Sequence, residues 1–340
     1  MAGTFTFLSS FGGQGGRQMG DHARRGFVAA MAILWVGLLG PACSGGNETP
    51  ALGTSETPAP VTNPSVTPTV TSTTAPGTLE TTAPSSLRNA APEDFDPADF
   101  GDPTAGANEW IPLKPGWQSV RKGLVNVGSR RLEHIRVYTI TDVSKMVDGV
   151  RTVAVLDQDF NAGQLAEQAI DYLAEDQHGN VWYLGSYTEA YEGGQFVNAT
   201  DGWLAGVSGS KAGILMEALP KVGLSYYESD ALGEGPTAAK VVKTGGSKCV
   251  PFKCYRDVLV IQEGTSGEVE YKYYARGVGG ILTEPHYSGG EQETELLINV
   301  RQLSPQGLAE LAAEVMRLDH HAREVIPDVF ANSSPARRTL

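Results

Sequence analysis

Cysteine and positive charge are both scarce in this sequence. The 340 residues include 3 cysteines, and 26 lysines and arginines stand against 39 aspartates and glutamates, for a formal net charge of −13. Three of the basic residues and one of the acidic residues precede Cys43, so the chain after Cys43 is more acidic still. Because an acidic chain without a basic stripe repels phosphate backbones, the composition argues against nucleic acid as a partner.

The common catalytic motifs are also missing. The sequence has no G-x-S-x-G nucleophile elbow, no glycine-rich phosphate loop before a helix, no H-E-x-x-H and no C-x-x-C. It therefore points to no catalytic residue, and we expect no cofactor and no metal.

The N-terminal apolar run is too short for a membrane-spanning helix, which needs about 20 residues. It extends from Phe27 to Leu39, follows Arg24 and Arg25, and is followed by Cys43. A basic start, a short apolar centre and a small residue before the cleavage site form a bacterial export signal. With a cysteine directly after the cleavage site, the segment resembles the bacterial lipoprotein signal, in which that cysteine is lipidated. We predict an export signal in residues 1–42 and an extracytoplasmic protein anchored to the membrane by lipid on Cys43.

The signal departs from the usual pattern in two places. Lipoprotein signals usually carry leucine three residues before the cysteine and a small or aliphatic residue next, where this chain has Gly40 and Pro41. The residues before Met19 are rich in glycine and serine, and translation from Met19 gives a more ordinary signal. Arg24 and Arg25 fit either a twin-arginine export signal or two ordinary basic residues.

Residues 43–92 contain almost no charge and no aromatic side chain. Threonine, proline, serine and alanine dominate, so the segment cannot bury enough apolar surface to offset its ordering entropy. The prolines favour extended polyproline II, at about 3.1 Å per residue. We predict a disordered stalk between the lipid anchor and the rest of the chain.

From Asn108 to Arg301 the chain has the β-branched and aromatic residues and the turn residues of short strands. Asp148-Gly149 suits the positive φ angles of a hairpin turn. The predicted strands lie at residues 134–141, 152–156, 181–184, 195–197, 223–229, 238–243, 255–262, 268–275 and 293–302. A long antiparallel meander must curl or close. We predict a mainly β domain in residues 93–303, a meander forming a strongly curved sheet or a partly open barrel.

A single C-terminal α-helix is predicted over residues 304–327. Ser304 caps it, Pro305 suits the first turn and Pro327 ends it. Its apolar stripe comprises Leu308, Leu311, Val315, Leu318 and Val325. Residues 328–340 are predicted to be a flexible tail. Residues 165–174 fit a short helix or a strand, and we prefer a strand because turn signals flank them.

Two motifs in the β region, D-x-x-GNVWY-x-G at residues 176–185 and YKYYA-x-GVG at residues 271–279, resemble those of a known group of proteins. Between them, W-x-AGV, K-x-GI and PKVG-x-SY occupy residues 203–207, 211–214 and 220–226. In this order the motifs resemble a group of secreted bacterial proteins of uncharacterised function, many of them predicted lipoproteins. The resemblance implies a β-rich fold and an extracytoplasmic location, and it supplies no catalytic residue. Ser186, where the group usually has glutamate, departs from the pattern.

Cys249 and Cys254 are the two cysteines left once Cys43 is lipidated. Outside the cytoplasm such a pair most simply forms one disulfide. Metal binding needs more ligands, and the nearest histidines in sequence, His178 and His286, lie far away. We predict a structural disulfide rather than a redox or metal site.

Asp157-x-Asp159-x-Asn161 begins like a calcium-binding loop. The required glycine falls one position late, however, and Gln168 stands where a bidentate glutamate is needed. We therefore interpret this segment as a polar hairpin turn.

His320 and His321, with Glu324, could recruit a metal from one helical turn. Histidines also suit the negative end of a helix dipole, so we interpret them as residues of an exposed helix C-terminus.

Aromatic residues are dense on the predicted strands. The candidate ligand-binding residues are Trp182, Tyr183, Trp203, Tyr226, Tyr271 and Tyr273. Aromatics also favour half-buried sheet surfaces, so a core role is the alternative. Where Trp182 and Tyr183 are neighbours, one must face each side of the sheet.

Three classes of function fit these observations. The first is a non-enzymatic envelope lipoprotein whose β domain binds an apolar or sugar-like ligand, or an envelope protein. The second is a hydrolase of envelope polymers that uses an acidic pair. Its candidate acids are Asp171, Glu175, Asp176, Glu189 and Glu192. The third is a structural spacer, and we favour the first.

Overall fold

A computed structural model describes residues 94–233, 235–265, 268–286 and 293–339. The predicted export signal, Cys43 and the stalk lie outside these residues. The elements in chain order are η1 (Pro97–Asp99), β1 (Trp117–Val127), β2 (Arg130–Val147), β3 (Val150–Asn161), β4 (Gln164–Glu175), β5 (Val181–Glu192), β6 (Gln195–Leu204), β7 (Lys211–Met216), β8 (Ser225–Ala231), β9 (Gly235–Lys243), β10 (Ser247–Cys249), β11 (Cys254–Arg256), β12 (Leu259–Thr265), β13 (Glu268–Ala275), β14 (Gly279–Pro285), β15 (Glu293–Gln302), α1 (Pro305–Val325), α2 (Pro327–Phe330) and β16 (Arg337–Arg338).

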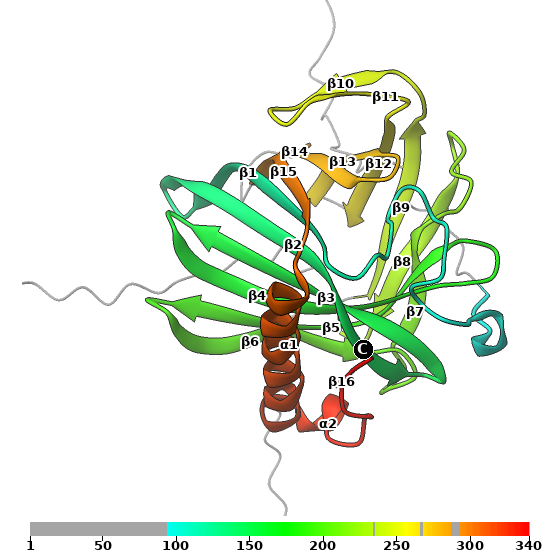
Figure 1. The fold of residues 1–340 in the computed structure, drawn as a ribbon, viewed down its shortest axis with the longest axis vertical. Helices are drawn as coiled ribbons and strands as arrows, with labels where there is room; N and C mark the ends of the chain where they lie inside the picture. Colours follow the sequence, from blue (N-terminus) through cyan, green and yellow to red (C-terminus); the bar gives the residue numbers. More distant parts are fainter. Residues whose placement is uncertain (1–93, 234, 266–267, 287–292, 340) are drawn as a thin grey trace, which may run out of the picture. The chain divides into compact units, whose positions relative to one another are not determined.

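Twelve of these strands form a closed, barrel-like sheet (Figure 1). The order around it is β1-β15-β14-β13-β12-β9-β8-β7-β5-β4-β3-β2, and β1 pairs with both β15 and β2. Neighbouring strands are antiparallel, so the predicted mainly β meander with a C-terminal helix is confirmed. The sheet closes, where the sequence suggested a strongly curved or partly open one.

Four strands lie outside this ring, β6, β10, β11 and β16. β6 pairs with the second half of β5, while the first half of β5 pairs with β7. β10 and β11 form a separate hairpin. The predicted turn at Asp148-Gly149 joins β2 to β3, and both residues have positive φ angles, 46° and 81°. Residues 165–174 lie in β4, as preferred from the sequence.

Helix α1 packs on the outer side of the sheet, over β2 to β5 (Figure 1). The side chain of Ser304 accepts a hydrogen bond from the backbone N–H of Gly307 at 3.2 Å, which is the predicted N-cap. Its buried face comprises Leu308, Ala312, Val315, Leu318, Asp319 and Ala322. In the described part of the chain, no helix has both the length and the hydrophobicity needed to cross a membrane.

The residues after α1, predicted to be a flexible tail, take up defined structure. α2 follows at Pro327–Phe330, and β16 pairs with β2. Nζ of Lys145, on β2, lies 2.9 Å from Oγ of Ser333 and 2.5 Å from the carbonyl oxygen of Ser334. These contacts hold the end of the chain against the sheet.

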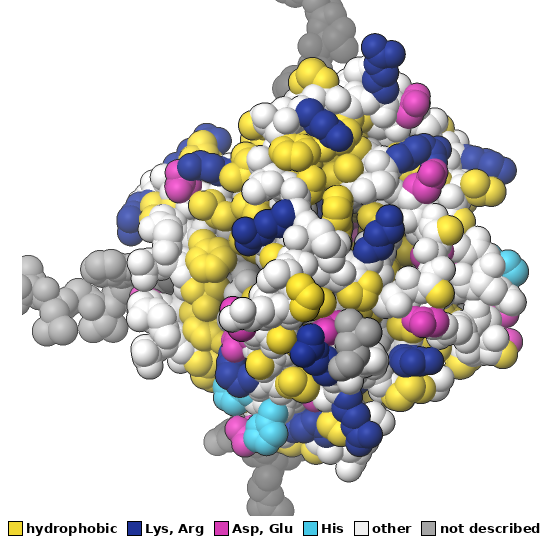
Figure 2. All heavy atoms as spheres, in the orientation of Figure 1, with side chains coloured by type: hydrophobic (Ala, Val, Ile, Leu, Met, Phe, Trp, Pro, Cys, Tyr) yellow, Lys and Arg dark blue, Asp and Glu magenta, His cyan; other side chains and the backbone are white. Residues whose placement is uncertain are grey.

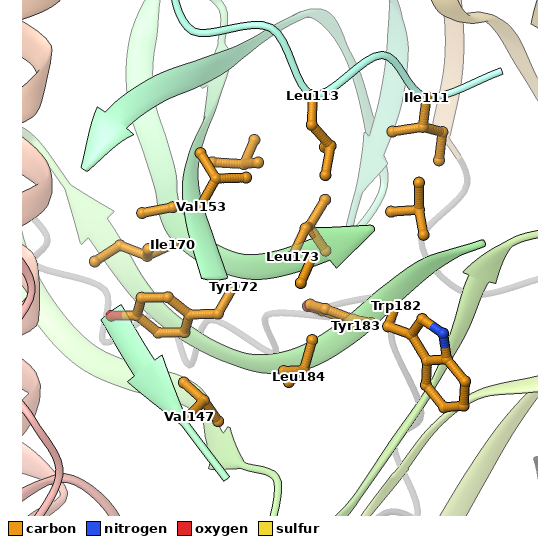
Figure 3. Packing of buried hydrophobic residues seen from close by; sticks show 14 of the residues in the cluster. Ile111, Leu113, Val147, Val153, Ile170, Tyr172, Leu173, Trp182, Tyr183 and Leu184 are labelled. Carbon is orange, nitrogen blue, oxygen red and sulfur yellow. The ribbon is translucent and has the colours of Figure 1, made fainter. Parts of the chain in front are cut away.

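The hydrophobic core extends from the barrel interior to the space beneath α1. The segment before β1 contributes Ile111 and Leu113, and Leu113 points toward Leu173 of β4 (Figure 3). Tyr172, the neighbour of Leu173, projects to the other face of the sheet. Both faces of β4 are therefore buried.

Candidate functional site

The interior of the barrel contains a cavity of about 160 Å³. The segment before β1 lines part of it through Ile111 and Pro112. Its aromatic lining residues are Trp117, Tyr138, Tyr183 and Tyr274. Its charged lining residues are Arg121, Arg136, Asp171, Glu228, Glu263, Glu270 and Lys272. Apolar, aromatic and ionisable side chains thus meet around one cavity.

The alternation of side chains along β2 explains part of this lining. Arg136, Tyr138 and Ile140 lie two residues apart, so they project to the same face. Arg136 pairs with Asp159 of β3, and Tyr138 pairs with Asp157. Because directly paired residues share a face, the two aspartates also project inward.

Asp171 of β4 accepts hydrogen bonds from two residues of β5. The hydroxyl of Tyr183 donates to Oδ1 of Asp171 at 2.7 Å, and the hydroxyl of Ser186 donates to the same oxygen at 3.2 Å. Burial, together with the charge of Asp157, raises the pKa of Asp171 to about 6, although these hydrogen bonds oppose the change. A carboxyl with such a pKa in a cavity is typical of a functional site.

A second set of ionisable side chains lies on β8, β12 and β13. Nζ of Lys272 is 2.5 Å from Oε2 of Glu263, and the hydroxyl of Tyr274 donates to Oε1 of Glu263 at 3.0 Å. Oε1 of Glu228 is buried and has no hydrogen-bond partner among the described residues. Burial and the charge of Glu263 raise the pKa of Glu228 well above its usual range. Burial raises the pKa of Glu270 to about 7.

Arg136 connects the cavity to a further charged cluster. Its Nε lies 2.9 Å from each carboxylate oxygen of Asp157, and its Nη1 lies 3.2 Å from Oε1 of Glu295. Nη1 of Arg121 lies 2.9 Å from Oε2 of Glu295. Burial alone would raise the pKa of Glu295, but the two guanidinium groups hold it well below its usual range.

His134 is the buried imidazole of this cluster. Its Nδ1 lies 2.8 Å from Oδ1 of Asn161, and its Nε2 faces carboxylate oxygens of Asp159, Glu293 and Glu295. Burial lowers the pKa of His134, but the carboxylates outweigh burial and raise it to about 10. In the described ranges, ligand atoms of His134, Glu293 and Glu295 lie within 4.8 Å of one another, close enough to hold a metal ion.

Of the six candidate ligand-binding aromatics, only Tyr183 lines the cavity. Trp182 projects to the opposite face of the sheet from Tyr183, as the alternation of neighbouring side chains along a strand predicts. There its ring lies 5.5 Å from that of Phe95, and its Nε1 donates to Oδ2 of Asp176 at 2.8 Å. Trp203 does not line the cavity, and its ring centroid lies 5.2 Å from that of Tyr183.

The other three aromatics also lie away from the cavity wall. Tyr226 is fully buried in the core. Tyr273 donates to Oε2 of Glu284 at 2.8 Å, and the ring of Tyr271 lies 4.8 Å from that of His286. Trp117, Tyr138 and Tyr274 line the cavity and are not among the six candidates.

The five candidate acids of a hydrolase do not form a pair in the cavity. Asp171 is the only one of them that lines it. Glu175 accepts hydrogen bonds from the backbone N–H groups of residues 107 and 108, and Asp176 caps the turn before β5. Glu189 is bonded to groups beneath α1, and Glu192 is exposed at the end of β5.

The prediction of a polar hairpin turn at residues 157–161 is wrong. Asp157, Asp159 and Asn161 lie in β3, and the turn follows at Ala162-Gly163. The alternation of their acidic and amide side chains reflects a strand whose inner face contacts Arg136 and His134.

The two histidines of α1 differ in environment. His320 is exposed, with Nδ1 3.7 Å from Oε1 of Glu324. His321 packs against Phe196, and its Nδ1 lies 2.6 Å from Oε1 of Glu189 on β5. His321 therefore also connects the helix to the sheet.

The structure contains the predicted disulfide between Cys249 and Cys254. The two cysteines are paired residues of the β10–β11 hairpin, with Cα atoms 3.9 Å apart. On the face shown in Figure 2, lysine and arginine side chains are scattered rather than gathered into one patch, in line with the absence of a basic stripe in the sequence.

No protein-family model matches the sequence, and no curated protein matches it. One similar solved structure is a proposed exported protein with a YmcC-like fold from Bacteroides fragilis, with a TM-score of 0.33 and 12% identity, covering 57% of this chain and 100% of that one. Another is a proposed lipoprotein from Parabacteroides distasonis, with a TM-score of 0.31 and 13% identity, covering 57% of this chain and 99% of that one. Both descriptions agree with the class of protein that the sequence motifs resemble. At these TM-scores the similarity carries no argument about function, and the family stays a prediction.

Proposed function

We propose that the chain is an exported lipoprotein, anchored through Cys43, whose barrel binds a small sugar-like ligand without transforming it. The observation that carries this proposal is the interior cavity, whose wall combines aromatic rings with buried hydrogen-bonding groups. The export signal pattern and the acidic composition support the location outside the cytoplasm.

The size of the cavity limits the ligand. Pockets for drug-sized molecules usually measure about 300–1,000 Å³, and this cavity measures about 160 Å³. A single small ring or one terminal unit of a longer glycan is therefore a better match than a lipid chain.

The polarity of the wall favours a sugar over an apolar ligand. An apolar molecule beside Glu228 and Asp171 would leave their carboxyl groups without new partners, and unpartnered buried polar groups are costly. A sugar offers hydroxyl groups to these carboxyls and to Arg121, and its C–H face can pack on the ring of Tyr183. Oε1 of Glu228, which lacks a hydrogen-bond partner in the described part of the chain, is available to such a hydroxyl.

The proposal can be tested with the full chain purified in detergent. Titration calorimetry with neutral and amino monosaccharides should give saturable binding, whereas an apolar fluorescent probe should bind more weakly. Tyr183→Ala should weaken sugar binding by about 1–3 kcal/mol, and Glu228→Gln should also weaken it. Tyr271→Ala is the matched control, because Tyr271 lies outside the cavity lining. Equal loss in the Tyr183 and Tyr271 variants, or no binding of any sugar, would reject the proposal.

A hydrolase is the second candidate, and the pKa of Asp171 is the observation that favours it. A carboxyl with a pKa of about 6 can act as a general acid near neutral pH. Turnover of an envelope glycan by the chain, abolished in Asp171→Asn, would favour this candidate over simple binding.

A further inference from the structure

None of His134, Asp159, Glu293 and Glu295 lines the cavity, and two buried polar atoms among them lack hydrogen-bond partners in the described part of the chain. Neither Nε2 of His134 nor Oδ1 of Asp159 has such a partner among the described residues. The two atoms face each other at 3.6 Å, and His134 is 1% exposed. Buried polar groups in folded proteins are nearly always satisfied, so two such atoms this close together point to a ligand that both can contact.

We propose that His134, Asp159, Glu293 and Glu295 form a binding site for a divalent first-row transition-metal ion. Nε2 of His134 lies 3.6 Å from Oδ1 of Asp159, 3.9 Å from Oε2 of Glu293 and 3.7 Å from Oε1 of Glu295. These separations exceed hydrogen-bond range. Donor atoms about 2.0–2.2 Å from a common ion in tetrahedral geometry lie about 3.3–3.6 Å apart, so the three separations from Nε2 are within a few tenths of an ångström of those that an ion needs.

The imidazole is already oriented as a metal ligand. Nδ1 of His134 lies 2.8 Å from Oδ1 of Asn161, an oxygen that can only accept. Nδ1 must therefore donate, so Nε2, which faces the carboxylates, is the nitrogen that can offer its lone pair to an ion once its proton is displaced. Metal-binding histidines usually show this arrangement, in which the second ring nitrogen donates to a fixed oxygen.

The charges of the cluster also suit a divalent cation. Its carboxylates are Asp157, Asp159, Glu293 and Glu295, and its guanidinium groups are Arg121 and Arg136. With the imidazole protonated, four carboxylates face three cationic groups, and a divalent ion that displaces the Nε2 proton of His134 brings the sum of these charges to zero. An imidazole combined with carboxylates favours ions such as Zn²⁺, Co²⁺ or Mn²⁺ over Mg²⁺ and Ca²⁺, which prefer oxygen ligands alone.

A metal at this site would be close to the proposed binding cavity. Arg136 lines the cavity and also contacts Glu295 and Asp157. An ion bound to Glu295 would fix the position of the carboxylate that Arg136 contacts. We therefore assign the ion a role in positioning Arg136, and the metal site stands independently of what the cavity binds.

The test uses the full chain, without a histidine tag, stripped of metal by a chelator and held in detergent. Titration calorimetry with Zn²⁺ should show one ion bound per chain, while Mg²⁺ and Ca²⁺ should not bind. With Co²⁺, proton NMR should show a paramagnetically shifted, solvent-exchangeable signal from the Nδ1–H of a coordinated imidazole. Absence of saturable Zn²⁺ binding would overturn the proposal.

Matched variants locate the ion. Glu293→Gln should weaken Zn²⁺ binding at least about tenfold, and Asn161→Ala should weaken it by about 10- to 100-fold, as loss of a partner of a ligating histidine usually does. Glu284→Gln, on the outer face beside Lys248, should have no effect. His320→Ala tests the exposed pair on α1 as a competing site.

His134→Ala removes a buried side chain, so its cooperative melting has to be checked. If this variant does not fold, Glu293→Gln decides, because the side chain of Glu293 is 25% exposed and its substitution disturbs packing little. Unchanged affinity in Glu293→Gln, or loss of binding in His320→Ala, would show that the ion lies elsewhere and would overturn the assignment.

Discussion

Lys145 of β2 and Asp319 of α1 form an ion pair that is buried between the sheet and the helix. Nζ of Lys145 lies 2.7 Å from Oδ1 of Asp319, and the two side chains are 0% and 4% exposed. The hydroxyl of Tyr172 donates to the same carboxylate oxygen at 3.0 Å, and the backbone N–H of Ala336 donates to the other oxygen. One carboxylate thus connects the sheet, the helix and the last residues of the chain.

Lys145→Met is expected to lower the free energy of unfolding by about 3–5 kcal/mol, because it leaves the carboxylate of Asp319 buried without its cation. Lys211→Met is the matched control, since Lys211 and Asp230 form an exposed pair with side chains 67% and 40% exposed. That change should cost no more than about 1 kcal/mol. Urea denaturation of both variants measures the difference, and equal effects would contradict the importance of the buried pair.

Asp171→Asn should change how stability depends on pH. The folded pKa of Asp171 is about 6, whereas an unfolded aspartate titrates near about 3.9. Between these values the folded state binds more protons than the unfolded state, so stability falls as pH rises through this window. The contribution of Asp171 is fully present below about pH 4 and lost above about pH 6.

The asparagine variant cannot ionise, so it avoids this loss and keeps an acceptor for Tyr183. At pH 4 it should match the natural chain, and at pH 7 it should be more stable by about 3 kcal/mol, at about 1.36 kcal/mol for each unit of the shift. Denaturation curves at the two pH values test this. A variant that is less stable at pH 7 would mean that Tyr183 and Ser186 hold Asp171 in its charged form.

The disulfide should protect both cysteines of the β10–β11 hairpin. In protein recovered from its native compartment, Cys249 and Cys254 should resist alkylation until a reductant is added, as intact mass would show. Closing so small a loop contributes about 2 kcal/mol if the effect is mainly on the unfolded chain. Two free thiols in freshly isolated protein would contradict this prediction.

The strand pattern was readable from the sequence where one face of a strand is polar and turn residues flank it, as at Asp148-Gly149. It was less readable in β4, because that strand is buried on both faces and loses its alternation. Of the ring strands, β1, β7 and β14 were not predicted, and β1 is the strand that pairs with both β2 and β15 to close the barrel. The prediction of a strongly curved sheet or a partly open barrel lacked this closing strand.

The candidate site was less predictable than the fold, because aromatic density alone does not tell which face of a strand is inside. The alternation rule correctly separated Trp182 from Tyr183, but it did not say which of the two faced inward. The acidic residues of β3 were interpreted as part of a hairpin turn, because charged side chains are rarely buried without partners. Their partners, Arg136 and His134, lie on β2, more than 20 residues earlier.

Cys43→Ser tests the membrane anchor. If lipid on Cys43 holds the protein, the variant should move from the membrane fraction to the soluble extracytoplasmic fraction. Detergent-phase partitioning of the natural chain gives the reference. A variant that stays in the membrane fraction would show that another segment or partner is the anchor.

Substitutions of Trp182 and Tyr183 should affect stability and ligand binding separately. Trp182 packs against Phe95 and Phe100 on the face opposite the cavity, is 4% exposed and donates to Asp176. Trp182→Ala should therefore lower the free energy of unfolding by about 3–5 kcal/mol, and any variant that still folds should bind the ligand normally.

Tyr183→Phe should show the reverse. The substitution keeps the ring that packs against Trp203 and removes only the hydroxyl that donates to Asp171. Its cost in stability should be about 1 kcal/mol, while sugar affinity should fall because the adjoining Asp171 carboxyl loses its fixed position. Thermal melting and calorimetric titration of both variants give the two quantities. If Trp182→Ala weakens binding as much as Tyr183→Phe does at matched stability, then the ligand does not contact the inner face of β5 and the cavity is not its site.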